Sequence, residues 1–390
     1  MTKSSYARLG RLPIIALDGP SALVLYRDRD DAALVRSPPT YATGATVDLP
    51  YLSDEDIAAS LASTNVFGHR AFDPLVDGGG ESADAPSLRR ARVKSLAHCA
   101  SCSADFKRMP YAELGLRPRA SDSPLYVLIT NDLARRKVRN VRQRALSSRV
   151  PEGSLRWLGT SVLVPSPELM LLLLAHHLDV VDVITACMEV CGRYRLVGTT
   201  SNELFRSNRT LYDQGQLSTP KRILDLCDRA RGISGRALLQ RACKYFAPNS
   251  SSPMETVVYL LLCLPRSLGG YGLPKPLLNA RRRVTACAGK ITFSQTLIPD
   301  LYWPAARLDM EYDSDEFHSD LESLQMGARR TMALRAMNVD VLSVTYDLVS
   351  DERAFDAMAR MVAKRLRVRL PDGRAVNQEK RRELRGRLLT

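Results

Sequence analysis

The fold of the last third of the chain depends on the stretch PDLYWPAARLDMEYD, residues 299–313. Its two halves predict β-strands, and residues 304–307 fit a four-residue hairpin loop between them. In the second half, apolar and acidic residues alternate. Because successive side chains of a strand point to opposite faces, one face is apolar and the other is acidic. The acidic residues of this second half are Asp309, Glu311 and Asp313.

This hairpin is expected to bring carboxylates together. If Trp303 pairs with Leu308, the register places Asp300 directly across from Glu311, with Cβ atoms roughly 5 Å apart. Asp313 shares a face with Glu311. Carboxylates this close repel one another unless a cation lies between them, and their hard oxygen atoms suit Mg²⁺ or Mn²⁺. The sequence therefore predicts a metal site formed by Asp300, Glu311 and Asp313.

The composition favours a basic protein that binds nucleic acid. The 390 residues carry a formal net charge of +14, with an isoelectric point near 9.6. Such a charge is typical of nucleic-acid-binding proteins, although an arginine-rich proteome has the same effect. No segment reaches the ~18 apolar residues of a membrane span, so no membrane partner is expected. Eight scattered cysteines indicate reduced thiols, and the start lacks the apolar core of a secretion signal, so we expect a cytoplasmic protein.

Composition along the chain divides it into five parts. Residues 1–72 predict an N-terminal α/β segment, and the glycine-rich residues 73–87 predict a flexible linker. Residues 88–248 predict a basic strand hairpin followed by helices. Residues 249–370 predict the last domain, and residues 371–390 a basic tail. The fold class is α/β, with a mixed sheet flanked by helices in the last domain.

The elements expected in the last domain follow from capping and periodicity. Its first helix begins at Ser252, where the spacing to Glu255 fits a capping box. After residues 299–313 we expect a helix at 319–337, a strand at 339–344 and a helix at 352–365.

The densest basic segment lies in the middle of the chain and begins with Arg135, Arg136 and Lys137. Its charges suit contacts with phosphates, each of which adds to a salt-dependent affinity. They equally suit an exposed edge strand that is kept soluble by charge, and both interpretations stay open. Near the start, residues 21–27 fit either a short helix or a second strand.

Two further patterns are not assigned a catalytic or metal-binding role. Cys99 and Cys102 form a lone CxxC pair, whereas a structural zinc site needs four ligands, so we expect thiols. His176 and His177 are adjacent at the end of a helix that begins at Ser166. Neighbouring helical residues point about 100° apart, so these two histidines rarely bind one metal ion.

The C-terminal third resembles the PD-(D/E)xK nuclease superfamily. It resembles more closely the bacterial endonuclease-domain family related to the very-short-patch mismatch-repair endonuclease. The resemblance covers about residues 250–365 and implies a restriction-endonuclease-like mixed sheet. The matching pieces are SPME (252–255), GLPKP (272–276), DLYWP (300–304), LDMEYD (308–313) with His318, Arg329 or Arg330, Leu334 and VLSV (341–344).

The resemblance implies metal-dependent hydrolysis of phosphodiester bonds in DNA. Asp300 and Glu311 would bind Mg²⁺ or Mn²⁺, and Asp313 or a water would complete the shell. Glu255 would orient the ion or its water, and His318 would transfer a proton. Each of the last three residues has a second interpretation: Glu255 completes a capping box, Asp313 is a turn residue, and His318 is structural.

The same resemblance assigns phosphate contacts to Lys290, Arg329 and Arg330. The sequence departs from the superfamily pattern at one position: Asp313 stands where the superfamily has a lysine that activates the attacking water.

Residues 13–27 and 124–196 resemble N-terminal regions related to abortive-infection antitoxin-like proteins. This suggests phage defence, DNA repair or a toxin–antitoxin system as the setting, with a possible protein partner. The alternative function is therefore an inactive nuclease-like protein that binds nucleic acid or acts as an antitoxin or regulator.

Overall fold

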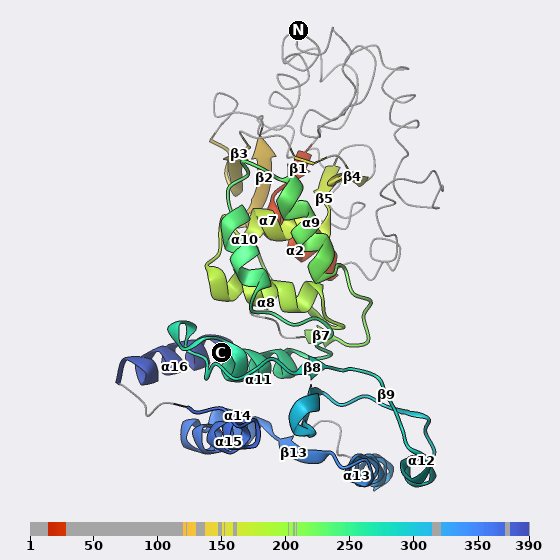
Figure 1. The fold of residues 1–390 in the computed structure, drawn as a ribbon. Coiled ribbons are helices and arrows are strands. Elements are labelled where there is room, and N and C mark those ends of the chain that lie inside the picture. The colour runs from red at the N-terminus through yellow and green to blue at the C-terminus, as the bar shows by residue number, and fades with distance from the viewer. Residues whose placement is uncertain are drawn as a thin grey trace, which may run out of the picture. The chain divides into compact units, whose positions relative to one another are not determined.

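A computed structural model of the chain describes residues 15–28, 120–121, 123–129, 137–146, 150–151, 153–158, 162–201, 203–205, 207, 209–313, 321–370 and 375–389. These residues form mixed sheets flanked by helices, which confirms the α/β class (Figure 1). The chain divides into two compact units. The second unit consists of Ile184–Tyr194, Tyr212–Gln216 and Lys244–Thr390, and the first unit is the rest of the chain.

The first unit contains a five-stranded sheet with the strand order β3-β2-β1-β5-β4. Its central strand β1 runs antiparallel to β2 and parallel to β5, and a smaller sheet pairs β6 with β7. The predicted segments 1–72 and 88–248 therefore contribute strands to one sheet. The strands are β1 (Ile15–Leu17), β2 (Leu125–Ile129), β3 (Val141–Ala145), β4 (Leu155–Leu158), β5 (Val162–Pro165), β6 (Arg195–Val197) and β7 (Arg209–Leu211). The helices are α2 (Gly19–Asp28), α7 (Pro167–Leu174), α9 (Pro220–Arg229) and α10 (Arg236–Cys243), and α8 (Val180–Val190) ends in the second unit.

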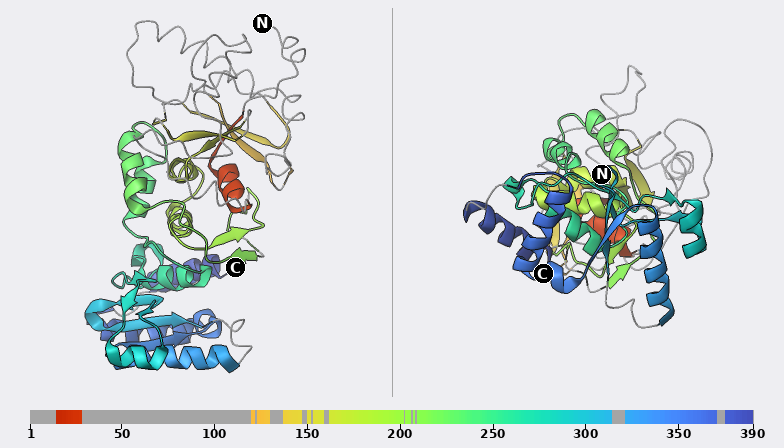
Figure 2. Two further views of the ribbon diagram at one scale, coloured as in Figure 1. Left: turned by 90° about the vertical axis from the view of Figure 1, so that its right-hand side faces the viewer. Right: turned by 60° about the horizontal axis from the view of Figure 1, so that its bottom comes forward.

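Helix α2, where the sequence left helix and strand open, is the buried centre of the first unit. All its residues from Gly19 to Arg27 are buried, and it lies beside α7 against the sheet (Figure 2). Gly19 permits this approach, because a Cβ there would lie 2.6 Å from the backbone nitrogen of Leu174. The Ser21 hydroxyl accepts a hydrogen bond from the backbone N–H of Tyr126 (2.8 Å), which joins α2 to β2.

Asp18, directly before α2, is fully buried and joins three parts of the first unit. Its Oδ1 accepts hydrogen bonds from Gly19 N–H (2.8 Å) and Arg144 Nη1 (3.3 Å), and its Oδ2 lies 2.7 Å from Nε2 of His177. Arg144 also donates to the carbonyl of Leu173 (3.1 Å). This arginine of the basic segment is therefore a buried structural cation, and His177 has a partner that the sequence did not indicate.

Strands β2 and β3 pair in parallel, so the basic hairpin predicted within residues 88–248 is wrong. A run of charges contains no turn signal that fixes the direction of the next strand. β3 lies at the edge of the sheet, and Lys137, Arg139 and Arg142 are exposed.

Helix α7 begins as the sequence predicts. The Ser166 hydroxyl accepts a hydrogen bond from Leu169 N–H (3.3 Å), Pro167 is the first helical residue, and every residue of α7 is buried. In the part of the chain that the structure describes, no helix is long and apolar enough to cross a membrane.

The second unit contains a four-stranded sheet with the order β13-β12-β11-β8. β8, β11 and β12 pair antiparallel, whereas β12 and β13 pair in parallel. The strands are β8 (Leu277–Leu278), β9 (Arg282–Arg283), β10 (Thr296–Leu297), β11 (Leu301–Trp303), β12 (Leu308–Tyr312) and β13 (Asp340–Val344). The helices are α11 (Pro253–Cys263), η2 (Arg266–Leu268), α12 (Ala286–Thr292), η3 (Pro304–Ala306), α13 (Leu321–Ala336), α14 (Tyr346–Ser350), α15 (Glu352–Arg365) and α16 (Ala375–Leu388). The strand predicted at 339–344 and the helix at 352–365 are confirmed by β13 and α15.

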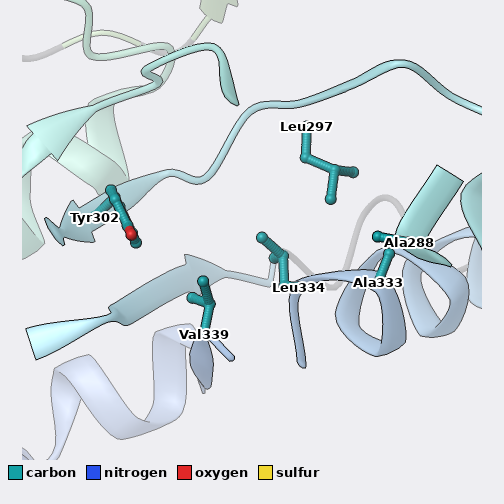
Figure 3. Close-up of a cluster of buried hydrophobic side chains, with 6 residues drawn as sticks. All are labelled: Ala288, Leu297, Tyr302, Ala333, Leu334 and Val339. Carbon is teal, nitrogen blue, oxygen red and sulfur yellow. The ribbon is translucent and has the colours of Figure 1, made fainter. Parts of the chain in front are cut away.

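One face of this sheet is covered by α12 and α13 (Figure 3). Between them, small side chains allow close approach: Ala288 of α12 and Ala333 of α13 are both fully buried. This cluster fixes α13, which supplies a residue of the candidate site, against the sheet. Its buried members are Ala288, Leu297, Tyr302, Ala333, Leu334 and Val339.

The predicted basic tail, residues 371–390, contains helix α16 where the structure describes it. This helix packs against η2 and α11. Arg381 lies 3.2 Å from Asp356 and its guanidinium lies 4.2 Å from the ring centre of Tyr271. Arg385 is buried and donates to the carbonyl of Ser350 (3.0 Å). These partners are distant in the sequence, so the charges of the segment alone did not indicate them.

Two glycines of the second unit predict opposite effects of alanine substitution. A Cβ at Gly270 would lie 2.0 Å from the carbonyl oxygen of Leu264, whereas nothing lies within 4 Å of a Cβ at Gly327, which is exposed on α13. We expect Gly270→Ala to lower the free energy of unfolding by about 1–3 kcal/mol through overpacking. Gly327→Ala should raise it by about 0.5–1 kcal/mol through helix propensity. Urea denaturation of both variants measures this, and equal midpoints would contradict it.

Candidate active site

The hairpin of residues 299–313 forms with the predicted register. β11 and β12 are antiparallel, with Trp303 opposite Leu308 and Tyr302 opposite Asp309. Asp300 directly precedes β11, and its Oδ2 accepts a hydrogen bond from the backbone N–H of Tyr312 (3.0 Å). Asp300 is therefore held against the strand that carries Glu311, as the sequence predicted.

The cation between Asp300 and Glu311 in this structure is the guanidinium of Arg330. Its Nη2 lies 3.4 Å from Oδ1 of Asp300 and 2.8 Å from Oε2 of Glu311. The same nitrogen donates to the carbonyl of Ile298. Arg330 was predicted to hold phosphate, but here the carboxylates engage it. The sequence predicted a divalent metal ion at this place, and in the structure the guanidinium of Arg330, on α13, lies there.

Asp309 belongs to this cluster, and the sequence analysis left it out of the proposed site. It is fully buried, and neither of its carboxylate oxygens has a hydrogen-bond partner within normal geometry. It shares a strand face with Glu311, two residues further along β12. The alternation of acids on β12 was the signal that could have included it.

Glu255 lies at the start of α11, where it completes the predicted capping box and is also linked to the hairpin. Its backbone N–H donates to the Ser252 hydroxyl (3.0 Å), and its Oε2 accepts from the backbone N–H of Ser251 (2.9 Å), so it caps the helix. Oε2 also accepts a hydrogen bond from the side-chain amide of Asn279 (2.5 Å). Asn279 in turn donates its backbone N–H to the carbonyl of Asp300 (3.0 Å). This chain of contacts links Glu255 to the hairpin.

Burial of these acids raises their pKa values. Burial, followed by the neighbouring Asp309 and Asp300, raises the pKa of Glu311 to about 11. Burial raises the pKa of Asp309 to about 6, and burial together with Asp300 raises that of Glu255 to about 7. The pKa of Asp300 is also raised by burial, although Arg330 opposes the shift. One guanidinium therefore compensates this group of carboxyls incompletely.

Of the other predicted site residues, Asp313 lies close enough to add to the rise that burial causes in the pKa of Asp300, and the rest are exposed or lie outside the described residues. Asp313 follows β12, half-buried, with its backbone N–H bonded to the carbonyl of Val344 (2.9 Å). Lys290 on α12 and Arg329 on α13 are exposed. The residues outside the described part are His318, Arg135, Arg136, Cys99 and Cys102.

The donor set nevertheless suits a hard cation. Carboxylate oxygens are the ligands that Mg²⁺ and Mn²⁺ prefer, and the buried Asp309 carboxyl interacts with that of Glu311 without a hydrogen bond of normal geometry. Within the described residues, no three His, Cys, Asp or Glu side chains are already arranged to hold a metal ion. An ion at this place would have to compete with Arg330 for Asp300 and Glu311. No protein-family model, curated protein or solved structure matches the chain.

The raised pKa of Asp309 predicts that the metal-free protein loses stability as the pH rises. The folded chain binds this proton more tightly than the unfolded chain, so the stabilisation is fully present below about pH 4 and is lost as the pH rises through about 6. A shift of two pKa units corresponds to about 3 kcal/mol. Urea denaturation from pH 4 to 8 in EDTA should show this fall in the wild type and a flatter profile in Asp309→Asn.

The matched control is Asp340→Asn, because Asp340 is an exposed aspartate that pairs with Arg365 on the surface of the same unit. It should keep the wild-type pH profile. Identical profiles for all three proteins would contradict a buried, poorly compensated Asp309.

Proposed function

We propose that this protein is a metal-dependent nuclease that hydrolyses phosphodiester bonds in DNA. The observation that supports it is the meeting of Asp300 and Glu311 across two strands, with buried Asp309 beside Glu311 and Glu255 linked to the hairpin through Asn279. Keeping these carboxyls together costs folding free energy, and such a cost is common at functional sites. The net charge of +14 suits a polyanionic substrate.

Asp300 and Glu311 are the residues that would hold Mg²⁺ or Mn²⁺ in this proposal. When bound, the ion supplies a water of lowered pKa and neutralises charge on the scissile phosphate. Asp309, on the same strand face as Glu311, adds negative charge next to these two ligands. Glu255, with a pKa raised to about 7, is suited to accept a proton near neutral pH. The superfamily uses a lysine to activate the attacking water, but this chain has Asp313 at that position.

The order of elements also supports the proposal. The nuclease resemblance was based on the order helix, hairpin, helix and strand. The second unit has this order in α11, the antiparallel strands β8, β11 and β12, helix α13 and the parallel strand β13. Asp300 and Glu311 lie together at Arg330, and Glu255 is linked to the hairpin through Asn279, which supports the roles proposed for these three acids. We propose a cytoplasmic role in phage defence, DNA repair or a toxin–antitoxin system.

One observation favours a second function. Arg330 already neutralises Asp300 and Glu311, as a structural cation does in a protein that binds DNA or a protein partner without cleaving DNA. In that case the chain is a nuclease-like antitoxin or regulator. The two functions differ in whether a divalent ion binds at Asp300.

Divalent ions should stabilise the wild type and permit cleavage. We expect 5 mM Mg²⁺ or Mn²⁺ at about 100 times the dissociation constant, on the order of 50 μM, to raise the free energy of unfolding by about 3 kcal/mol. Asp300→Asn should lose both this stabilisation and the cleavage of supercoiled plasmid, because it removes one ligand charge. Asp340→Asn should keep both.

If wild type and Asp300→Asn share the same background cleavage and the same thermal response to the ions, the nuclease proposal fails. A wild type that binds DNA without either response is the result expected from the second function.

DNA binding through the basic segment predicts a specific change in salt dependence. Each lost phosphate contact reduces the slope of log K against log salt by about 0.9. Replacing Arg135, Arg136 and Lys137 with glutamine should therefore lower the slope by up to about 3 in fluorescence anisotropy with a labelled duplex. The charge-matched control replaces three exposed cations on and after α9, namely Lys221, Arg229 and Arg231. Equal slopes for both triple variants would exclude this segment as a phosphate-binding surface.

A further inference from the structure

Phe293 is an aromatic residue in an unusual position. It ends α12 with φ of 57°, in the left-handed region, and its side chain is 82% exposed. Bulky residues rarely adopt this conformation, which glycine and asparagine adopt far more readily. A phenylalanine that is both strained and exposed stabilises the fold less than a small polar residue would. Such outliers are a reason to look for function.

The exposure of Phe293 does not come from a loosely held segment. Helix α12 is capped by Thr285, whose hydroxyl accepts a hydrogen bond from Ala288 N–H (3.3 Å). After the helix, β10 pairs with β9, and Leu297 is buried in the same cluster as Ala288 (Figure 3). We call residues 280–298 the basic arm. Its core-facing residues anchor it to α13, while Phe293 faces solvent.

The surroundings of Phe293 are strongly basic. The basic arm contains Arg281, Arg282, Arg283 and Lys290 and no acidic residue. Three of these are exposed, while the guanidinium of Arg282 lies 4.4 Å from the ring centre of Tyr302. The guanidinium of Arg329, on α13, lies 5.1 Å from the ring centre of Phe293. A flat aromatic ring beside one cation, on an arm that carries further cations, is the combination that single-stranded nucleic acid requires, because bases stack on the ring and phosphates contact the cations.

The basic arm is also connected to the candidate active site. Arg329 is adjacent to Arg330, which bridges Asp300 and Glu311. The arm leads directly into Asp300, since β10 ends at Leu297. A strand bound along the arm would therefore run near the carboxylates.

We propose that the basic arm binds a DNA strand with an unpaired base and that the ring of Phe293 stacks on that base. This inference rests on the proposed function only for its choice of DNA as the substrate. Four cations without an acid favour a polyanion over an apolar protein surface. A base within an intact duplex stacks on its neighbours and leaves no face for the ring, so the target is a single strand or a duplex with an unpaired base.

The decisive variant is Phe293→Asn, because it should separate binding from folding. Asparagine adopts the left-handed conformation more readily than phenylalanine, so the melting temperature should stay the same or rise by roughly 2–4 °C. Loss of one stacked base should weaken binding about 10-fold, within the range measured for base–aromatic stacking. Phe293→Trp keeps a stacking face and should bind within about twofold of the wild type. Tyr346→Ala is the control, since Tyr346 is another exposed aromatic residue of the second unit and should leave binding unchanged.

The measurement is fluorescence anisotropy in EDTA, so that cleavage does not contribute. The probes are a labelled 20-nucleotide single strand, a perfect duplex, and the same duplex with one unpaired base. The inference predicts that Phe293→Asn loses affinity for the first and third probes and keeps its affinity for the perfect duplex. Wild-type affinity of Phe293→Asn for all three probes would overturn it, and so would an equal loss for all three.

The outcome can be distinguished from that of the proposed function. A wild type that binds through Phe293 but does not cleave with Mg²⁺ or Mn²⁺ overturns the nuclease activity and leaves the stacking intact. A wild type that cleaves, with a Phe293→Asn variant that binds unchanged, overturns the stacking alone.

Discussion

The structure of the second unit depends on one guanidinium shared by two carboxylates. Arg330 reaches from α13 to Asp300, before β11, and to Glu311 on β12, and it also donates a hydrogen bond to the carbonyl of Ile298. This contact joins a helix, two strands and the end of the basic arm at one point. The small residues between α12 and α13 bring α13 close enough for it, because Ala288 and Ala333 are both fully buried. Packing and electrostatics therefore determine the same helix position.

The balance of charges around Arg330 is unfavourable for the stability of the fold. Four buried or nearly buried carboxyls, those of Glu255, Asp300, Asp309 and Glu311, have raised pKa values, and Asp309 has no hydrogen-bond partner of normal geometry. Apolar residues of similar volume at these positions would fold at a lower cost. The cost is consistent with selection for chemistry rather than for stability.

Patterns that repeat within about ten residues predicted the structure well. The alternation on β12 and the short loop gave the register of the hairpin, and the capping residues Ser166 and Ser252 gave the starts of α7 and α11. Interactions between distant residues were not predictable in this way. The packing of α16 against η2 and α11 depends on partners far along the chain. Arg330 looked like a phosphate ligand for the same reason, since nothing near it in the sequence shows which charge it meets.

The central place of β1 in the first sheet has a consequence for the synthesis of the protein. Ala16 pairs with Leu128 on one side and with Leu163 on the other, so both neighbours are translated more than a hundred residues later. The ribosome must therefore extend the chain past β5 before this sheet can close, and loop closure over such distances slows folding. Until then, the apolar residues of β1 and α2 remain without their native partners. Chaperones that bind nascent apolar segments would have their longest opportunity at this end of the chain.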